Sequence, residues 1–156
     1  MNYVLDTNII SEFMKPNPDF GALCWAQDHS EEMYLTSITL MELQYGLMRM
    51  PEGKRKKQLK EHIEAITREC AERLYDFDGF SAYYCAELRC KAQSVGFTPQ
   101  IADCMIAAIC QRNGATLVTH NTKDFQCYEI DMIDPFGYES ETLKELRRRD
   151  EANEAE

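Results

Sequence analysis

Short apolar runs that alternate with longer helical patterns restrict the fold of this sequence more than any other feature. Tyr3–Leu5, Met33–Leu35 and Ala115–Thr119 are typical of buried strands, and residues 73–77 and 130–133 are further candidates. Parallel strands need long crossover segments, and the helices in those crossovers cover both faces of the sheet. The alternation therefore predicts an α/β protein, a doubly wound α/β/α sandwich around a short-stranded parallel sheet.

Capping and breaking residues place the helices between these strands. We expect Ser37 or Thr39 to cap the third helix, Asp78 to cap the fifth, and Gly114 to end the sixth. The segment from 120 to 125 is typical of a polar loop. The expected helices cover residues 8–14, 19–27, 37–50, 54–70, 78–96, 101–113 and 140–149.

Length and composition predict one domain in the cytosol. A chain of 156 residues can bury a single core, so we expect one domain over residues 1–138. Residues 139–156 should form an exposed helix and a frayed acidic tail. The absence of a long apolar run and of a signal peptide argues against membrane association. Seven cysteines without a CxxC pair are typical of small apolar residues in a reducing compartment.

The charge of the chain opposes tight nonspecific binding of nucleic acid. The formal net charge is −10, whereas such binding depends on neutralising phosphates. One basic cluster, Lys54, Arg55, Lys56 and Lys57, stands out against this background. We predict that it contacts RNA, and a solvated helix face is the alternative interpretation.

Acidic side chains follow two of the predicted strands. Asp6 comes directly after Tyr3–Leu5, and Asn121 and Asp124 follow the strand that ends at Thr119. Ligands of open parallel sheets bind beyond the carboxyl ends of the strands. Asp6 could instead cap the next helix, although the neighbouring Thr7 and Asn8 could share that role.

Two further acids lie in strongly apolar helical segments. Glu42 belongs to a helix that is apolar on nearly every side and that we expect to be largely buried. A carboxylate there requires a partner, either Arg49 in a salt bridge or a bound cation. Asp103 is the only charged residue between Ile101 and Cys110. Its alternative role is to face the positive end of the helix dipole.

Taken together, the four acids predict a cation site. Clustered carboxylates repel one another unless a cation neutralises them, and ligand sets made only of oxygen favour Mg²⁺ or Mn²⁺. Such a site suits phosphodiester hydrolysis, because the ion activates water and stabilises the leaving oxygen. The sequence contains no glycine-rich phosphate loop and no GxSxG motif, so it gives no support to nucleotide binding or serine hydrolase chemistry.

Four short motifs resemble those of PIN-domain ribonucleases, specifically toxins of the VapC/FitB type. The candidate acids Asp6, Glu42, Asp103 and Asp124 follow one another at intervals of roughly 36, 61 and 21 residues, over nearly the whole chain. The matching stretches are Leu5–Asn8, Met41–Leu43, Ile101–Ala108 and Val118–Phe125.

The resemblance implies a PIN-like catalytic domain over residues 1–138 and the toxin of a toxin–antitoxin pair. It implies Mg²⁺- or Mn²⁺-dependent endoribonuclease activity, with tRNA or rRNA as substrate. It also implies a homodimer that a cognate VapB/FitA-like antitoxin keeps inactive. Apolar residues of the N-terminal half, including Leu40, Leu47 and Met50, are expected to supply the surface for dimerisation.

The family's acidic positions carry over onto Asp6, Glu42 and Asp103. Some relatives have Asp where Asn121 stands, whereas others resemble this chain, with Asn there and Asp three residues later. For the fourth position we therefore assign Asp124, with Asn121 as a supporting polar group. By the same resemblance Thr7, Asn8 and Thr119 hold carboxylates or metal-bound waters. His120 departs from the Arg that is often found at its position, and we expect this departure to alter the substrate contacts there.

Two other functions compete with this interpretation. The chain could be a catalytically inactive PIN-like module that binds RNA or a protein partner. The complete acidic set favours the enzyme, because a pure binder has no need of carboxylates near phosphates. A phosphoacceptor receiver domain would need two adjacent acids after the first strand, where this sequence has Thr7 and Asn8.

Overall fold

A computed structural model of the chain describes residues 1–142, 144–145 and 148. The predicted terminal helix, residues 140–149, lies only partly within these residues. Of its described residues, 141–142, 144–145 and 148 are helical. The predicted frayed tail, residues 150–156, lies outside them. Within the described chain, no helix combines the length and the apolar character that crossing a membrane requires.

The described elements follow the predicted alternation, and the sheet is shorter-stranded than expected. The strands predicted at 73–77 and 130–133 contain two residues each. In chain order the elements are β1 (Tyr3–Leu5), α1 (Thr7–Phe13), α2 (Phe20–Asp28), the 3-10 helix η1 (Ser30–Glu32), β2 (Met33–Thr36), α3 (Ser37–Met48), α4 (Lys54–Glu69), β3 (Leu74–Tyr75), α5 (Gly79–Ser94), α6 (Ile101–Asn113), β4 (Thr116–Val118), α7 (Thr122–Phe125) and β5 (Met132–Ile133).

All pairs of neighbouring strands in the sheet are parallel, as predicted. The strand order is β3-β2-β1-β4-β5, so β1 lies in the middle. Leu5 pairs with Val118 of β4, and Tyr3 pairs with Met33 of β2. The chain winds outward from β1 to β3 and then crosses to the other side through α5 and α6. The winding direction therefore reverses between β1 and β4, which is where open α/β sheets bind ligands.

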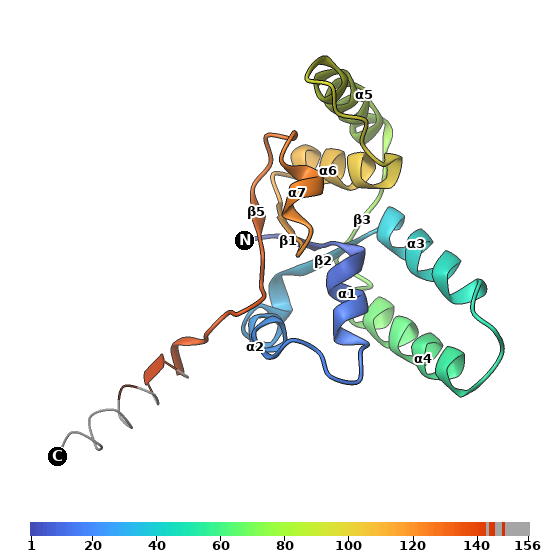
Figure 1. Cartoon of the computed structure of the whole chain (residues 1–156), viewed down its shortest axis with the longest axis vertical. Helices are drawn as coiled ribbons and strands as arrows, with labels where there is room; N and C mark the ends of the chain where they lie inside the picture. Colours follow the sequence, from blue (N-terminus) through green and yellow to red (C-terminus); the bar gives the residue numbers. More distant parts are fainter. Residues whose placement is uncertain (143, 146–147, 149–156) are drawn as a thin grey trace.

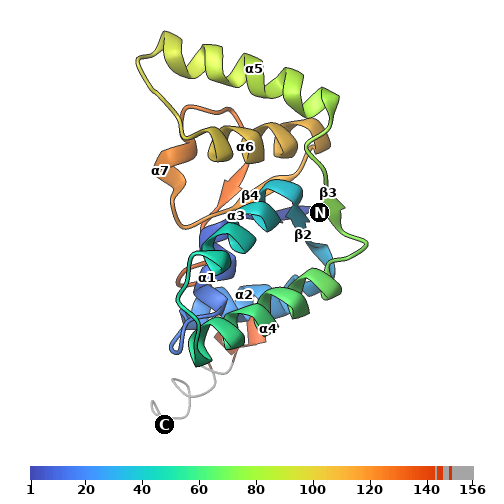
Figure 2. The same cartoon turned by 90° about the vertical axis from the view of Figure 1, so that its right-hand side faces the viewer.

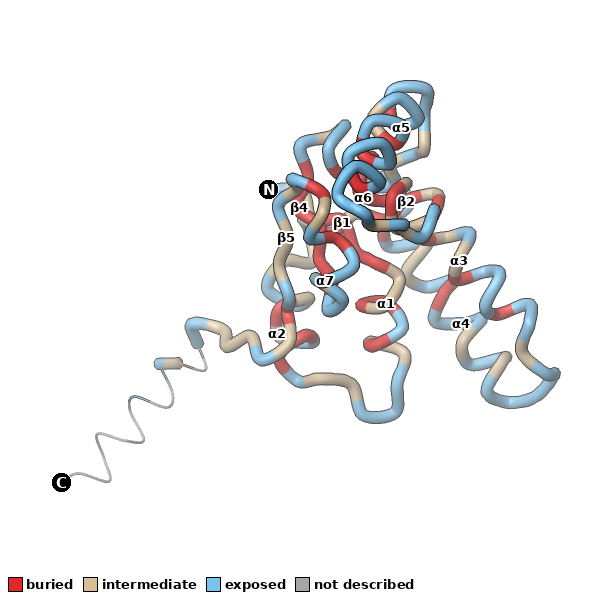
Figure 3. The backbone as a smooth tube through the Cα atoms, turned by 45° about the horizontal axis from the view of Figure 1, so that its top comes forward, coloured by how far each residue is buried: buried red, intermediate tan, exposed pale blue. Residues whose placement is uncertain are grey.

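Helices cover both faces of this sheet, and each face has its own core. Val4 and Leu117 belong to the cluster under α5 and α6, whereas Leu5 and Val118 belong to the cluster with α1, α2 and α4. Figures 1 and 2 show these two helical layers on either side of the strands. Figure 3 shows most of β1 and β4 as buried, and their burial by both clusters explains why these strands are apolar without alternation.

Several local predictions are wrong in detail. The N-cap of α3 is Thr36, whose hydroxyl accepts a hydrogen bond from the backbone N–H of Thr39, and it is neither Ser37 nor Thr39. Asp78 and Gly114 do cap α5 and α6 as predicted. The segment predicted as a polar loop contains the short helix α7.

The prediction that α3 is largely buried is also wrong. Met41, Tyr45 and Met48 are 50%, 59% and 73% exposed, and they lie at helical spacing on one face. Leu47, which we expected on the surface, is buried, and Leu40 packs against the same core. The apolar surface of α3 therefore belongs to a different face from the predicted one. Of the seven cysteines, Cys70, Cys85, Cys104 and Cys110 are buried.

The segment after β5 passes directly over α2. Gly21 makes this approach possible, because a Cβ at that position would lie 2.4 Å from the backbone nitrogen of Tyr138. The Tyr138 hydroxyl donates a hydrogen bond to Asp28 at 3.0 Å. These contacts hold residues 134–138 beside the edge of the sheet where β4 and β5 end.

Candidate active site

Asp6 stands at the carboxyl end of β1, and both of its oxygens are occupied. One accepts the backbone N–H of Thr7 at 2.8 Å, which makes Asp6 the N-cap of α1. The other accepts hydrogen bonds from Asn8 and Thr119, each at 2.8 Å. Burial raises the pKa of Asp6, and the hydrogen bonds from Thr119 and Thr7 act against that rise. Asp6 is thus both a helix cap and a buried acid.

Thr119 joins β4 to this acid. Its hydroxyl donates to Asp6 and accepts the side-chain N–H of Asn8 at 3.1 Å and the backbone N–H of Asn121 at 3.0 Å. The predicted supporting residues Thr119 and Asn8 therefore do hold a carboxylate. Thr119 is fully buried, so its hydrogen bonds hold Asp6 in a fixed orientation.

Glu42 reaches the same region from α3. It accepts a hydrogen bond from the hydroxyl of Thr7, which follows Asp6 in the chain. The alternative of a salt bridge to Arg49 is wrong, because none of the ion pairs in the described chain joins them. The Arg49 guanidinium lies 5.3 Å from the centre of the Tyr45 ring instead.

Asp103 connects all four acids electrostatically. It lies in the first turn of α6 and is partly buried. Burial, followed by repulsion from Asp6, Glu42 and Asp124, raises the pKa of Asp103 to about 6. The structure therefore brings the four predicted acids within one electrostatic site, at the point where the winding direction reverses.

Asp124 is the most exposed of the four acids. It lies in the first turn of α7, and its backbone N–H donates to the carbonyl of Asn121 at 3.0 Å. Asn121 is exposed as well, and its side chain makes no capping hydrogen bond. Asp124 contributes a negative charge that acts on both Asp6 and Asp103. The assignment of Asp124 as the fourth acid, with Asn121 as a supporting polar group, stays a prediction.

The chemistry of these donors fits a hard divalent cation. Four carboxylates repel one another, and the charged groups that act on Asp103 are all acids. As placed, however, no three acidic, histidine or cysteine side chains of the described chain converge closely enough to hold one ion. Asp6 and Glu42 are turned toward their hydrogen-bond donors, so a cation would compete with Thr7 for Glu42.

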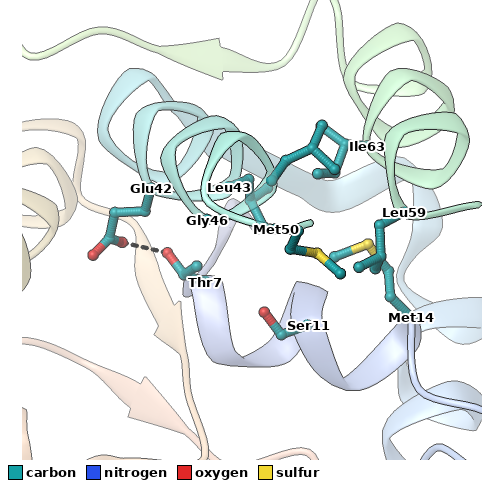
Figure 4. Close-up of a pocket in the computed structure, with 10 residues that line it drawn as sticks. Thr7, Ser11, Met14, Glu42, Leu43, Gly46, Met50, Leu59 and Ile63 are labelled. Carbon is teal, nitrogen blue, oxygen red and sulfur yellow. Dashed lines mark hydrogen bonds between the residues drawn. The ribbon is translucent and has the colours of Figure 1, made fainter. Parts of the chain in front are cut away.

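A mainly apolar groove begins at Glu42 and runs between α1, α3 and α4. Figure 4 shows Glu42 and Thr7 at one end of it, with Met14 and Leu59 at the other. This part has a volume of about 370 Å³. An adjoining hollow of about 560 Å³ shares Met14 and Leu59 and is also lined by Arg55. The predicted basic cluster thus lies outside the acidic site, and the groove connects the two.

The strand-end argument did not single out Asp134, which contacts a histidine beside the acids. That histidine is His120, which follows Thr119, and its ring lies against Asp134 and Phe136. Asp134 comes directly after β5, so the rule that predicted Asp6 and Asp124 would also have indicated this position. The two-residue length of β5 made that strand a weak signal in the sequence.

The fold and the acids together define a doubly wound α/β protein with an acidic site where its winding reverses. The PIN domain model matches residues 3–129, and the chain belongs to that family. The resemblance seen in the motifs is thereby confirmed, together with the predicted fold class.

Individual relatives match over most of their length. VapC ribonuclease Y4jK of Sinorhizobium fredii is 36% identical over 135 residues, which are 85% of this chain and 96% of that protein. Toxin FitB of Neisseria gonorrhoeae is 33% identical over 85% of this chain and 97% of that protein. A chain in the structure of FitAB bound to an IR36 DNA fragment superposes with a TM-score of 0.81 at 31% identity, covering 89% of this chain and 99% of that one.

The raised pKa of Asp103 predicts a pH-dependent cost in the metal-free protein. The folded chain holds this proton more tightly than the unfolded chain, so the free energy of unfolding falls as pH rises from 3.8 through about 6. Asp103→Asn removes the ionisation. We expect its stability advantage over the wild type to grow by about 1 kcal/mol between about pH 5 and about pH 8, allowing for solvent screening.

Urea denaturation in EDTA at both pH values measures this difference. Asp131→Asn, at an exposed aspartate outside the site, is the matched control and should show no such growth. An Asp103→Asn advantage that is equal at both pH values would contradict the electrostatic account.

Proposed function

We propose that the chain is a Mg²⁺- or Mn²⁺-dependent endoribonuclease and the toxin of a toxin–antitoxin pair. The observation that carries the proposal is the gathering of four acids at the carboxyl end of β1. Asp6 is held there by hydrogen bonds, Glu42 reaches it through Thr7, and Asp103 is close enough to be acted on by the charges of the other three. A site with this excess of negative charge gains most from a bound divalent cation. The ribonuclease and toxin names of its relatives in the PIN family support RNA as the substrate.

In the proposed mechanism Asp6, Glu42, Asp103 and Asp124 are the catalytic residues and would hold the metal ion as carboxylate ligands. A bound ion would supply an activated water and a Lewis acid for hydrolysis of a phosphodiester bond. Asn8 and Thr119 hold one Asp6 oxygen in place, and Thr7 holds Glu42. Hydrogen bonds of this kind orient ligating carboxylates and keep them from rotating. We infer tRNA or rRNA as the substrate from the family resemblance.

We further propose that RNA phosphates bind the basic cluster at the start of α4. Arg55 lines the hollow that adjoins the groove from Glu42, so the cluster lies along one path to the acids. Lys56 pairs with Glu52 at 2.5 Å, which leaves Lys54, Arg55 and Lys57 as the more exposed members. Positive charges at a helix N-terminus are repelled by the positive end of the helix dipole, so α4 itself does not stabilise this cluster.

Removing the metal or one central acid should abolish RNA cleavage. We expect EDTA to eliminate activity, Mn²⁺ or Mg²⁺ to restore it, and Asp6→Asn or Asp103→Asn to lower the rate by at least about 100-fold. Cleavage of labelled RNA by the purified full chain measures this, with circular dichroism as the check on folding. Full activity in EDTA would refute the metal mechanism, and RNA binding without any cleavage by the wild type would favour the inactive binding module.

Neutralising the basic cluster should weaken RNA binding while leaving the metal site unchanged. With Lys54, Arg55, Lys56 and Lys57 all changed to Gln, we expect a higher KM and a salt dependence of binding that is flatter by about 2 to 3 in the log–log slope. A variant with Arg89 and Lys91 changed to Gln, both exposed on α5, is the matched control. If both variants bind RNA equally well at low salt, the cluster is only a solvated helix face.

The proposed assembly is a homodimer that a VapB/FitA-like antitoxin holds inactive. The stripe of Met41, Tyr45 and Met48 on α3 is apolar and exposed, and such stripes commonly mark protein interfaces. The similarity to a chain of FitAB supports the antitoxin as a second partner.

Light scattering of the full chain at micromolar concentration should give the mass of a dimer. Changing Met41, Tyr45 and Met48 together to Glu should give a folded monomer, because three charges cannot be buried in an apolar interface. Adding the antitoxin to the wild type should form a larger complex without RNA cleavage. A monomeric wild type, or undiminished cleavage at saturating antitoxin, would contradict the assembly.

A further inference from the structure

The ring of His120 is held on one face and one edge. Its plane lies 10° from that of Phe136, with ring centres 3.7 Å apart, so the two rings stack. Its Nδ1 lies 3.0 Å from a carboxylate oxygen of Asp134. Asp134 and Phe136 both belong to the segment after β5, which runs beside β4 (Figure 3). The orientation of His120 is therefore determined by two contacts from a neighbouring segment of the sheet edge.

The same ring remains open to solvent. Half of the His120 side chain, 50%, is exposed, although Phe136 and Asp134 cover one face and one edge. An aromatic pair that served only the core would be buried. What stays exposed is a flat aromatic surface in a fixed orientation.

A short chain of hydrogen bonds connects this surface to the acids. The backbone N–H of His120 donates to the Asn8 side-chain carbonyl at 3.3 Å, and the Asn8 amide donates to Asp6 at 2.8 Å. The residue before His120, Thr119, donates to the same Asp6 oxygen. The ring thus has a defined place relative to the carboxylate that is central to the site.

We propose that His120, backed by Phe136, is the stacking surface for an unpaired nucleobase of the RNA beside the scissile phosphate. This inference rests on the proposed ribonuclease function. A base fits better than a phosphate, because Asp134 and the nearby acids repel an anion. Proteins that recognise single-stranded RNA stack its bases on aromatic side chains, including histidine. The surface would therefore select single-stranded segments over helical RNA.

The test measures binding of the full chain to a single-stranded oligoribonucleotide, in the Asp103→Asn background so that the RNA stays intact. We expect His120→Ala to raise Kd by about 5- to 100-fold and His120→Tyr to stay within about 3-fold. Phe20→Ala, which removes an exposed ring from α2, is the matched control and should leave Kd unchanged.

A series of oligonucleotides that each lack one base provides the second measurement, made on the chain with His120 intact and on His120→Ala. Loss of the base at one position should weaken binding to the chain with His120 intact and have little effect on His120→Ala. If Kd is unchanged whichever base is removed, or if His120→Ala folds and binds as well as its parent, the stacking surface does not exist.

Cleavage kinetics separate stacking from other roles. Stacking predicts that His120→Ala raises KM and that Tyr restores it, with kcat nearly constant. A His120→Tyr protein with normal KM and abolished kcat would overturn the proposal and make His120 a proton-transfer group. Failure of the wild type to cleave RNA with Mn²⁺ would instead refute the ribonuclease function, whatever His120 does to binding.

Discussion

Repulsion among four carboxylates is the constraint on which the rest of the site depends. Burial of Asp103, followed by the charges of Asp6, Glu42 and Asp124, raises the pKa of Asp103 to about 6. Hydrogen bonds from Thr7, Asn8 and Thr119 hold two of these acids despite the repulsion. The fold therefore holds several negative charges close together. A divalent cation binds well to such a cluster of carboxylates.

The order of the strands brings these groups together. Because the winding reverses between β1 and β4, Asp6 and Thr119 end adjacent strands although 113 residues separate them. Helices α3 and α6 then start near this edge and supply Glu42 and Asp103. Each strand contributes only a few backbone hydrogen bonds, so the two cores on either side must fix the sheet.

The surface around the site divides into regions of different chemistry. Acids occupy the centre, the groove between α1, α3 and α4 leads to Arg55, and the exposed ring of His120 lies just after the end of β4. A chain with a net charge of −10 can hold a polyanion only through such local features. In the proposed complex, RNA phosphates would contact the basic cluster, an unpaired base would contact His120, and the scissile phosphate would lie at the acids.

The sequence by itself determined the fold class, the parallel sheet and the family, since apolar periodicity and motif spacing are local properties of the chain. It also indicated all four acids, because a carboxylate at a strand end or in an apolar helix stands out without any structure. The exposed face of α3 and the partner of Glu42 were predicted wrongly. Both depend on which residues pack against α3 in the folded chain, and the pattern along the sequence does not determine this. The pairing of His120 with Asp134 and Phe136 likewise became visible only in the tertiary structure, because only the packing of β5 beside β4 brings residues 14 and 16 positions away against one ring.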